Sequence, residues 1–348
     1  MTDAPHRLDC SAAALADNWR ALARLSGAAA CGAAVKADGY GLGAIAVATR
    51  LADAGCRDFY VATWAEAAAL VPALAGGPAR IAVLHGARGA DVAFAELPGV
   101  RPVLSTAAQV RRWREAGAGR ACDVMVDTGM NRLGVAPEEV ADGLLDGLAL
   151  DTLLSHLACA DEPGHPLNAT QRARFAALAG QTAAKRMSLA NSAGIALGAD
   201  YHLDLTRPGL ALYGGVPVPA LGDVLRPVAT ITAEVLQRRL VRAGETVGYN
   251  ATWRARADTA VVIANLGYAD GYYRAFSDRG RAFAGDAALP VIGRVSMDLV
   301  ALDATGVDVG EGEWLRFDPD LPAMAAASGM SQYELLTGLG RRLERRWV

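Results

Sequence analysis

One lysine in this chain stands where an amine nucleophile could act. Lys36 ends the small apolar run Ala33-Ala34-Val35 and is followed by the glycine-rich turn Gly39-Tyr40-Gly41-Leu42-Gly43. The chain has 34 Lys plus Arg, and only Lys36 and Lys185 are lysines. A guanidinium stays protonated and cannot attack a carbonyl, whereas a desolvated lysine amine can. We therefore interpret Lys36 as a Schiff-base nucleophile, with a snorkelling lysine at a strand end as the alternative.

Four further polar motifs each stand directly after or at the end of an apolar run. They are Arg132, His156, Asn191-Ser192 and Arg207-Pro208-Gly209. In a parallel barrel the carboxyl ends of all strands face one mouth, so we expect these groups to lie together with Lys36. Barrels of this kind often bind phosphate after strands seven and eight, where Ser192 offers a hydroxyl and Gly209 an open backbone N–H. A lysine beside a phosphate site indicates pyridoxal phosphate.

Each motif taken alone also has a structural explanation. Residues 127 to 132 could form an ordinary strand-end turn. His156 could be a satisfied core histidine, and Arg207 could simply pair with Asp204. The glycines of residues 39 to 43 could make a tight turn between strand and helix. These separate explanations do not predict that all of the polar motifs lie on one rim of the barrel.

The first two thirds of the chain repeat a unit of apolar run, polar turn and helical stretch. This alternation predicts an N-terminal (β/α)8 barrel, because eight strands separated by helices close a parallel barrel. An opening helix is expected at 11 to 25. The predicted strands are 31 to 35, 57 to 62, 80 to 84, 101 to 104, 121 to 127, 151 to 157, 186 to 190 and 203 to 207. The predicted helices are 44 to 54, 64 to 74, 88 to 96, 106 to 116, 137 to 148, 170 to 184 and 192 to 198.

The repeat of apolar run, polar turn and helical stretch ends after Tyr213-Gly214-Gly215. Short β-rich runs separated by turns follow, for example 228 to 235, 259 to 264 and 291 to 300, and predict a mainly antiparallel β domain. The segment Val216-Pro217-Val218-Pro219 with Gly222 is the expected linker. We place the barrel at 1–222 and the β domain at 223–348, and residues 1–10 could join the β domain.

The composition of the chain argues against several classes of binding partner. The chain has 348 residues, 52% of them hydrophobic, and a formal net charge of −3, so it provides no electrostatic field for nucleic acid or an anionic membrane. Its five cysteines lack the spacing of a disulfide framework or a zinc site, and no metal is expected. The sequence gives no reason to expect a signal segment or a membrane-spanning run. We expect a soluble cytoplasmic protein with free thiols.

Eight motifs, in this order and spacing, resemble the alanine racemase family over essentially the full chain. They are 35–43 (VKADGYGLG), 126–134 (VDTGMNRLG), 155–161 (SHLACAD), 190–193 (ANSA), 207–214 (RPGLALYG), 247–249 (VGY), 267–271 (GYADG) and 293–298 (GRVSMD). The resemblance implies a pyridoxal phosphate enzyme with a barrel and a C-terminal β domain, acting as a homodimer with shared active sites.

The resemblance also implies roles for individual residues. Lys36 and Tyr249 would be the two catalytic bases. The cofactor would be held by Lys36, Tyr40, His156, Asn191, Ser192, Arg207, Gly209 and Leu210, with Arg207 at the pyridine nitrogen and His156 hydrogen-bonded to Arg207. The substrate carboxylate would contact Arg132 and the Met297 backbone N–H. Asp161, Tyr268, Arg274, Arg294 and Asp298 would surround the substrate's access path.

Two departures from the family pattern stand out. Met125 occupies the position where many members have a carbamylated lysine that orients the arginine, which leaves open how Arg132 is held. The tail Arg342-Leu343-Glu344-Arg345 replaces a common Arg-Val-Pro-Arg, and Arg341 stands where some members have a phosphate-contacting tyrosine.

The expected reaction is the interconversion of L-alanine and D-alanine. Racemisation removes the α-proton from one face and returns one to the other, so two bases on opposite faces suit it. A racemase of broader specificity that accepts serine, or a pyridoxal phosphate barrel that does not racemise, remains an alternative at this point. The choice between a biosynthetic and a catabolic role also stays open.

Overall fold

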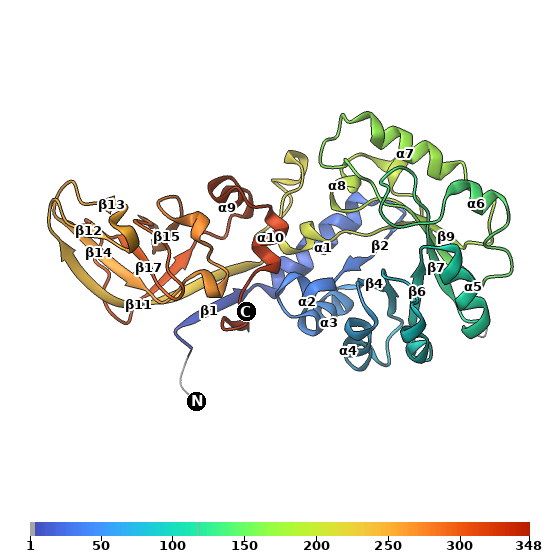
Figure 1. Cartoon of the computed structure of the whole chain (residues 1–348), viewed down its shortest axis with the longest axis horizontal. Coiled ribbons are helices and arrows are strands. Elements are labelled where there is room, and N and C mark those ends of the chain that lie inside the picture. The colour runs from blue at the N-terminus through green and yellow to red at the C-terminus, as the bar shows by residue number, and fades with distance from the viewer. Residues whose placement is uncertain (1–3, 118) are drawn as a thin grey trace. The chain divides into compact units, whose positions relative to one another are not determined.

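The computed structural model describes residues 4–117 and 119–348. These residues form two compact units, each described by itself. The barrel unit is Leu15–Leu225, and the β unit joins the N-terminal segment through Ala14 to Arg226–Val348 (Figure 1). Within the described ranges, no helix is long and apolar enough to cross a membrane. All five cysteines are free thiols.

Seven parallel strands of the barrel unit follow one another in chain order. They are β3 (Ala33–Ala34), β4 (Asp58–Val61), β5 (Arg80–Val83), β6 (Val100–Leu104), β7 (Cys122–Met125), β8 (Leu150–Leu154) and β9 (Arg186–Ser188). The eighth position is β10 (Leu205–Thr206), which pairs in parallel with β2 (Ala30–Cys31). The predicted first strand is thus split at Gly32, where a Cβ would lie 2.9 Å from the Asp58 carbonyl oxygen.

Backbone hydrogen bonds on both sides of β10 close the barrel. The Arg207 N–H donates to the Ala190 carbonyl at 2.8 Å, and the Gly32 N–H donates to the Thr206 carbonyl at 2.9 Å. The predicted eight-stranded barrel is therefore confirmed.

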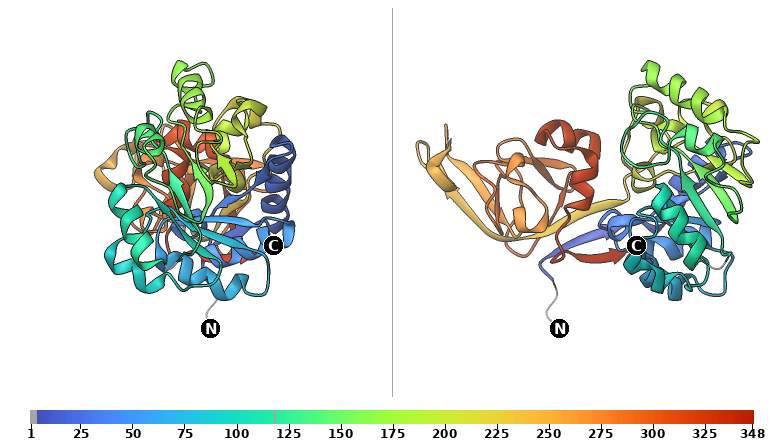
Figure 2. Two further views of the ribbon diagram at one scale, coloured as in Figure 1. Left: turned by 90° about the vertical axis from the view of Figure 1, so that its right-hand side faces the viewer. Right: turned by 45° about the vertical axis from the view of Figure 1, so that its right-hand side comes forward.

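Helices follow most of these strands and lie outside them, as the blue-to-green ribbons of Figure 2 show. The α-helices are α1 (Ala12–Leu25), α3 (Ala44–Ala54), α4 (Trp64–Leu74), α5 (Ala107–Ala116), α6 (Pro137–Ala141), α7 (Pro166–Ala176) and α8 (Ser192–Ile195). Residues Lys36–Tyr40 (α2) form a turn of unusual hand described below. Short 3-10 turns are η1 (Gly89–Phe94), η2 (Ala199–Tyr201), η3 (Leu210–Tyr213) and η4 (Pro219–Leu221).

Four predicted helices were wrong in extent or type. The stretch 88–96 is a 3-10 turn, 137–148 ends at Ala141, and 192–198 ends at Ile195. The stretch 170–184 begins earlier, at Pro166, and ends at Ala176. Glycines in left-handed conformations beyond three of these ends explain the shortening, at Gly143 (φ 82°), Gly180 (φ 76°) and Gly198 (φ 107°).

The β unit is mainly antiparallel. Its principal strands are β1 (His6–Cys10), β11 (Ala229–Val241), β14 (Thr259–Ala264), β15 (Arg281–Ala284), β16 (Ala287–Pro290), β17 (Val300–Asp303), β18 (Trp314–Phe317) and β19 (Glu344–Trp347). Strand β1 lies between β11, its antiparallel neighbour, and β19, its parallel neighbour. The remaining elements are β12 (Thr246–Val247), β13 (Trp253–Arg254), η5 (Tyr249–Ala251), η6 (Tyr268–Asp270), η7 (Arg274–Phe276), α9 (Leu321–Ser328) and α10 (Gln332–Thr337).

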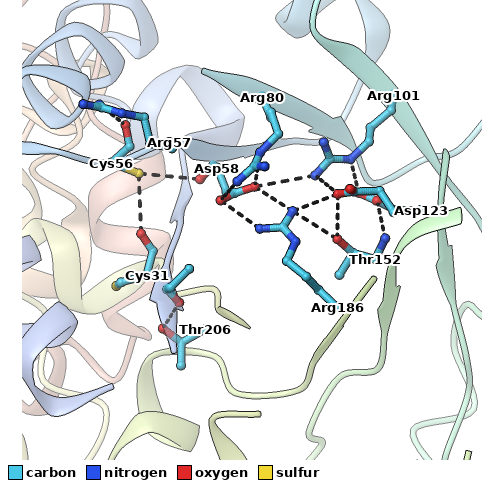
Figure 3. Close-up of polar contacts among 12 residues, drawn as sticks. Cys31, Cys56, Arg57, Asp58, Arg80, Arg101, Asp123, Thr152, Arg186 and Thr206 are labelled. Atoms are coloured by element: carbon cyan, nitrogen blue, oxygen red, sulfur yellow. Dashed lines mark hydrogen bonds and ion pairs between the residues drawn. The ribbon is translucent and has the colours of Figure 1, made fainter. Parts of the chain in front are cut away.

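A network of opposite charges fills the amino-terminal end of the barrel (Figure 3). It consists of Asp58, Arg80, Arg101, Asp123, Asp151 and Arg186. Arg101 Nε lies 2.7 Å from a carboxylate oxygen of the fully buried Asp123. Burial alone would raise the pKa of Asp58, but hydrogen bonds from Arg186 and Arg80 outweigh it and lower that pKa.

An apolar layer lies next along the same strands. It contains Tyr60, Ala82, Val103, Leu154 and Leu205, with Met125 packed against it. The barrel interior is therefore a packed core, with charges at one end and, as shown below, the candidate site at the other.

Loss of Arg101 should destabilise the barrel strongly, because Asp123 would remain buried without its partner. We expect Arg101→Met to lower the free energy of unfolding by about 3–5 kcal/mol, measured by urea denaturation. Arg20→Met is the control, since Arg20 and Asp17 form a pair that is 52% and 54% exposed and should change stability by less than about 1 kcal/mol. Equal effects of the two substitutions would contradict a structural role for the network.

Candidate active site

Lys36 lies at the carboxyl end of the first barrel strand. The Val35 N–H donates to the Tyr60 carbonyl at 2.8 Å, which continues the pairing with β4 up to the residue before Lys36. The Lys36 side chain is half-buried. Loss of hydration and then the charge of Arg132 lower its pKa, while the carboxylate of Glu66 opposes the change. A larger share of the Lys36 amine is therefore unprotonated and able to attack a carbonyl.

A left-handed turn follows Lys36. Ala37, Asp38 and Gly39 have φ/ψ values of 54°/51°, 53°/47° and 62°/43°, and Tyr40 has φ 55°. Asp38 Oδ1 accepts the Ala44 N–H at 2.9 Å and so joins the turn to α3. The Tyr40 ring stacks on Tyr213, with 4.5 Å between ring centroids. The turn thereby brings Tyr40 to the loop that follows β10.

Residues from the segments that follow β9 and β10 converge beside Tyr40. Ser192 Oγ accepts the Gly209 N–H at 2.9 Å and the Ala211 N–H at 3.2 Å. A Cβ at Gly209 would lie only 2.2 Å from Tyr40 Oη, so this close approach requires glycine. Asn191 caps α8 by accepting the Gly194 N–H at 2.8 Å, and Leu210 is buried at the start of η3. The Tyr40 and Ser192 hydroxyls and the Gly209 N–H thus lie together, and groups of this kind suit a phosphate.

Arg207 is buried, 7% exposed, and held by neutral groups. Its guanidinium donates to Ser188 Oγ and, at 2.5 Å, to the Ser155 carbonyl. The alternative pairing with Asp204 is not what the structure shows, because Asp204 accepts the Met187 N–H at 2.7 Å instead. The guanidinium bonds observed here go to the two serines, whereas the resemblance implied a bond with His156.

The His156 side chain sits among positive charges. Loss of hydration, followed by the charges of Arg207, Arg132 and Lys36, lowers the pKa of His156 to about 3. The imidazole is therefore neutral at physiological pH. It adds no charge to the mouth of the barrel.

Asp127 holds the loop that carries Arg132. Its Oδ1 accepts the N–H groups of Gly129, Met130 and Asn131, and its Oδ2 accepts the Arg132 N–H at 3.1 Å. Burial opposes ionisation, but these four bonds outweigh it and lower the pKa of Asp127. Met125 packs in the apolar layer of the barrel. In this chain the carboxylate of Asp127 fixes the Arg132 backbone, and the Arg132 side chain is exposed.

The candidate residues of the β unit form a second group. Tyr249, Tyr268, Arg274, Arg294 and Met297 line one cavity of about 240 Å³, together with Asn250. The Arg274 guanidinium lies 5.2 Å from the centre of the Tyr268 ring. Two guanidinium groups in one cavity favour a carboxylate ligand.

The two remaining predicted residues belong to different units, Asp298 to the β unit and Asp161 to the barrel unit. Asp298 follows Met297 and accepts a 2.8 Å bond from Arg342, which also binds the buried Asp270 at 2.8 Å. Asp161 is exposed in the loop after β8. Arg342 thus ties the divergent C-terminal tail to the segment that carries Met297.

Comparison with known proteins accounts for this combination of fold and residues. Residues 10–217 match the N-terminal domain of alanine racemases, and residues 228–347 match their C-terminal domain. The chain belongs to the alanine racemase family.

Relatives match this chain over nearly its full length. The alanine racemase of Acidiphilium cryptum is 44% identical over 95% of this chain and 96% of its own. The catabolic alanine racemase of Agrobacterium fabrum is 41% identical, over 96% and 90%. The crystal structure of alanine racemase from Bartonella henselae, with covalently bound pyridoxal phosphate, superimposes with a TM-score of 0.91 at 32% identity and covers 99% of this chain and 100% of its own.

Sequence reasoning missed one residue beside Lys36 in this alanine racemase family member. Glu66, at the start of α4, accepts the Ala37 N–H at 2.8 Å. A signal was present, since Thr63 and Glu66 have the spacing of a capping box. That signal predicts the bonds within α4 and gives no indication of Ala37.

The depressed pKa of His156 makes the stability of the apoprotein depend on pH. Between about pH 6.5 and pH 3 the unfolded chain binds a proton at His156 and the folded chain does not, so stability falls as pH is lowered through this window. Between pH 7 and pH 5, the free energy of unfolding of the wild type should fall by about 2 kcal/mol more than that of His156→Gln, measured by urea unfolding. His85→Gln, at an exposed histidine, should behave like the wild type. An identical pH dependence in His156→Gln would show that His156 is charged in the fold.

Proposed function

We propose that this chain is a pyridoxal-phosphate-dependent racemase that interconverts L-alanine and D-alanine in the cytoplasm. The observation that carries the proposal is Lys36, a half-buried lysine of lowered pKa at the mouth of a closed barrel. Family membership supports the reaction and the cofactor.

The residues present fit the cofactor. Tyr40, Ser192 and Gly209 form a cradle that a Cβ at Gly209 would fill, and it would take the phosphate together with Asn191 and Leu210. Lys36 would hold the cofactor through its aldehyde group, and Arg207 and His156 would contact its ring, with Arg207 toward the ring nitrogen. When bound, pyridoxal phosphate supplies an electron-withdrawing ring that acidifies the α-carbon of an amino acid.

The protein's own residues would then remove the α-proton from one face of the substrate and return a proton to the other face. Lys36 Nζ would act as base or acid on one face of the substrate, and Tyr249 Oη on the other. Arg132 and the Met297 backbone N–H would orient the carboxylate so that the α-hydrogen points at one of the two bases. The buried guanidinium of Arg207 has no proton-accepting atom, so it would not take a proton from the ring nitrogen.

We further propose a homodimer in which each active site combines Lys36 of one subunit with Tyr249 of the other. The support is the exposure of large side chains in the β unit. Tyr249 is 65% exposed and Met297 53%, and the apolar Leu236, Leu240 and Leu299 are 40%, 52% and 39% exposed. Tyr249 lines one cavity with Met297 and a second cavity with Leu299. Exposed apolar side chains that lie together are typical of a face that another molecule covers.

The role of Lys36 can be tested by chemical trapping. The purified protein should be yellow, convert L-alanine to D-alanine in a chiral product assay, and retain the cofactor on the Lys36 peptide after borohydride reduction. Lys185 is the internal control, because it is the only other lysine and is exposed. We expect Lys36→Ala to abolish racemisation and Lys185→Ala to leave it within about twofold of wild type. Trapping at Lys185 alone, or no bound cofactor, would refute the proposal.

The shared site can be tested by complementation. Lys36→Ala and Tyr249→Ala homodimers should both be inactive, and mixing them through unfolding and refolding should restore activity. Random pairing makes half the dimers mixed, each with one intact site of two, so the ceiling is about a quarter of wild type. Wild-type protein taken through the same cycle measures the refolding yield. Absence of recovery after verified subunit exchange would mean that each site is built from one chain.

A further inference from the structure

The turn after Lys36 has a conformation that its sequence does not favour. Four consecutive residues, Ala37 to Tyr40, have left-handed φ values, and only Gly39 among them lacks a Cβ. L-amino acids disfavour this region, and runs of it are rare. Contacts from outside the turn must therefore hold it, because its own residues would relax to another conformation.

Contacts at the far end of the turn come from its neighbours. Asp38 accepts the Ala44 N–H, and Tyr40 stacks on Tyr213. The Gly39 N–H donates back to the Val35 carbonyl at 3.0 Å. These contacts begin at the second residue of the turn.

Glu66 provides the contact at the near end, one residue from Lys36. Its Oε1 accepts the Ala37 N–H at 2.8 Å. Its Oε2 accepts the Ala62 N–H at 2.7 Å and the Thr63 N–H at 3.1 Å. One half-buried carboxylate therefore joins the loop after β3 to the loop after β4 through three backbone bonds.

We propose that Glu66 is a positioning residue for Lys36, which fixes the first residue of the left-handed turn and thereby the backbone from which the Lys36 amine reaches the cofactor. A hydrogen bond to an ionised acceptor is stronger than one to a neutral acceptor, and a carboxylate alone can serve both loops at once. The inference rests on the role proposed for Lys36.

The competing role for Glu66 is simple capping of α4. Thr63 Oγ accepts the Glu66 N–H at 3.2 Å, which completes a capping box at this helix start. Thr63→Ala is therefore a matched control, because it weakens the same cap and leaves the bond from Glu66 to Ala37 in place. Glu66→Ala removes the bond to Ala37 and the Glu66 half of the cap, which is its bonds to the Ala62 and Thr63 N–H groups. Glu66→Gln keeps the side-chain shape with one acceptor oxygen in place of two.

Hydrogen exchange in the apoprotein tests the bond directly. We expect exchange in the peptide covering residues 36–43 to rise about tenfold in Glu66→Ala, as loss of one charge-assisted hydrogen bond predicts, and to stay within about twofold in Thr63→Ala. Glu66→Gln should lie between them and guards against a misfolded alanine variant. Equal exchange in the Glu66→Ala and Thr63→Ala proteins would overturn the proposal.

Cofactor affinity tests the consequence for Lys36. The dissociation constant of pyridoxal phosphate, followed by borohydride trapping at Lys36 relative to Lys185, should rise about tenfold in Glu66→Ala and stay within about twofold in Thr63→Ala. Faster exchange with unchanged affinity would show that Glu66 holds the turn but does not position Lys36, and would overturn the inference. If wild-type protein itself shows no trapping at Lys36, the proposed function fails, a result distinct from either of these.

Discussion

Closure of eight strands into a barrel is the constraint on which the candidate site depends. The first strand must bond β4 on one side and β10 on the other, and it does so in two short pieces divided at Gly32, where the backbone of β4 leaves no room for a Cβ. Once the ring is closed, the carboxyl ends of all the strands meet at one mouth. Lys36, His156 and Arg207, which lie far apart in the sequence, become neighbours for this reason.

The charges of the barrel are separated along its axis. Three aspartates balance three arginines at the amino end, whereas the charged side chains of Lys36, Arg132 and Arg207 at the mouth are all positive. The carboxylates of Asp127 and Glu66 accept backbone N–H groups of the loops. Loss of hydration, and then the neighbouring positive charges, lower the pKa values of Lys36 and His156. The positive side chains favour ligands that carry phosphate and carboxylate.

The β unit carries the second group of candidate residues. It places a tyrosine hydroxyl and two arginines around one cavity, and its C-terminal tail holds this region through Arg342, which bridges Asp270 and Asp298. The tail differs from the common family pattern around this arginine, yet the bridging guanidinium is present. A large fraction of the Tyr249 side chain is exposed within the single chain.

The sequence by itself determined the barrel and the β domain, because alternating apolar runs, polar turns and helical stretches are local patterns. It also predicted candidate site residues at the strand ends, which closure of the barrel brings to one rim. It did not determine the ends of several helices, where left-handed glycines override helical composition, or the partners of Arg207, which are Ser188 and Ser155 and not Asp204. It also gave no sign that Asp127 holds the Arg132 loop while Met125 packs in the core, or that Glu66 reaches Ala37. Only the tertiary structure decided the partners of Arg207 and the reach of Glu66 to Ala37, because these contacts join segments that closure of the barrel brings together. The helix ends and the Asp127 loop are local, but they depend on backbone conformations that the residue types alone do not specify.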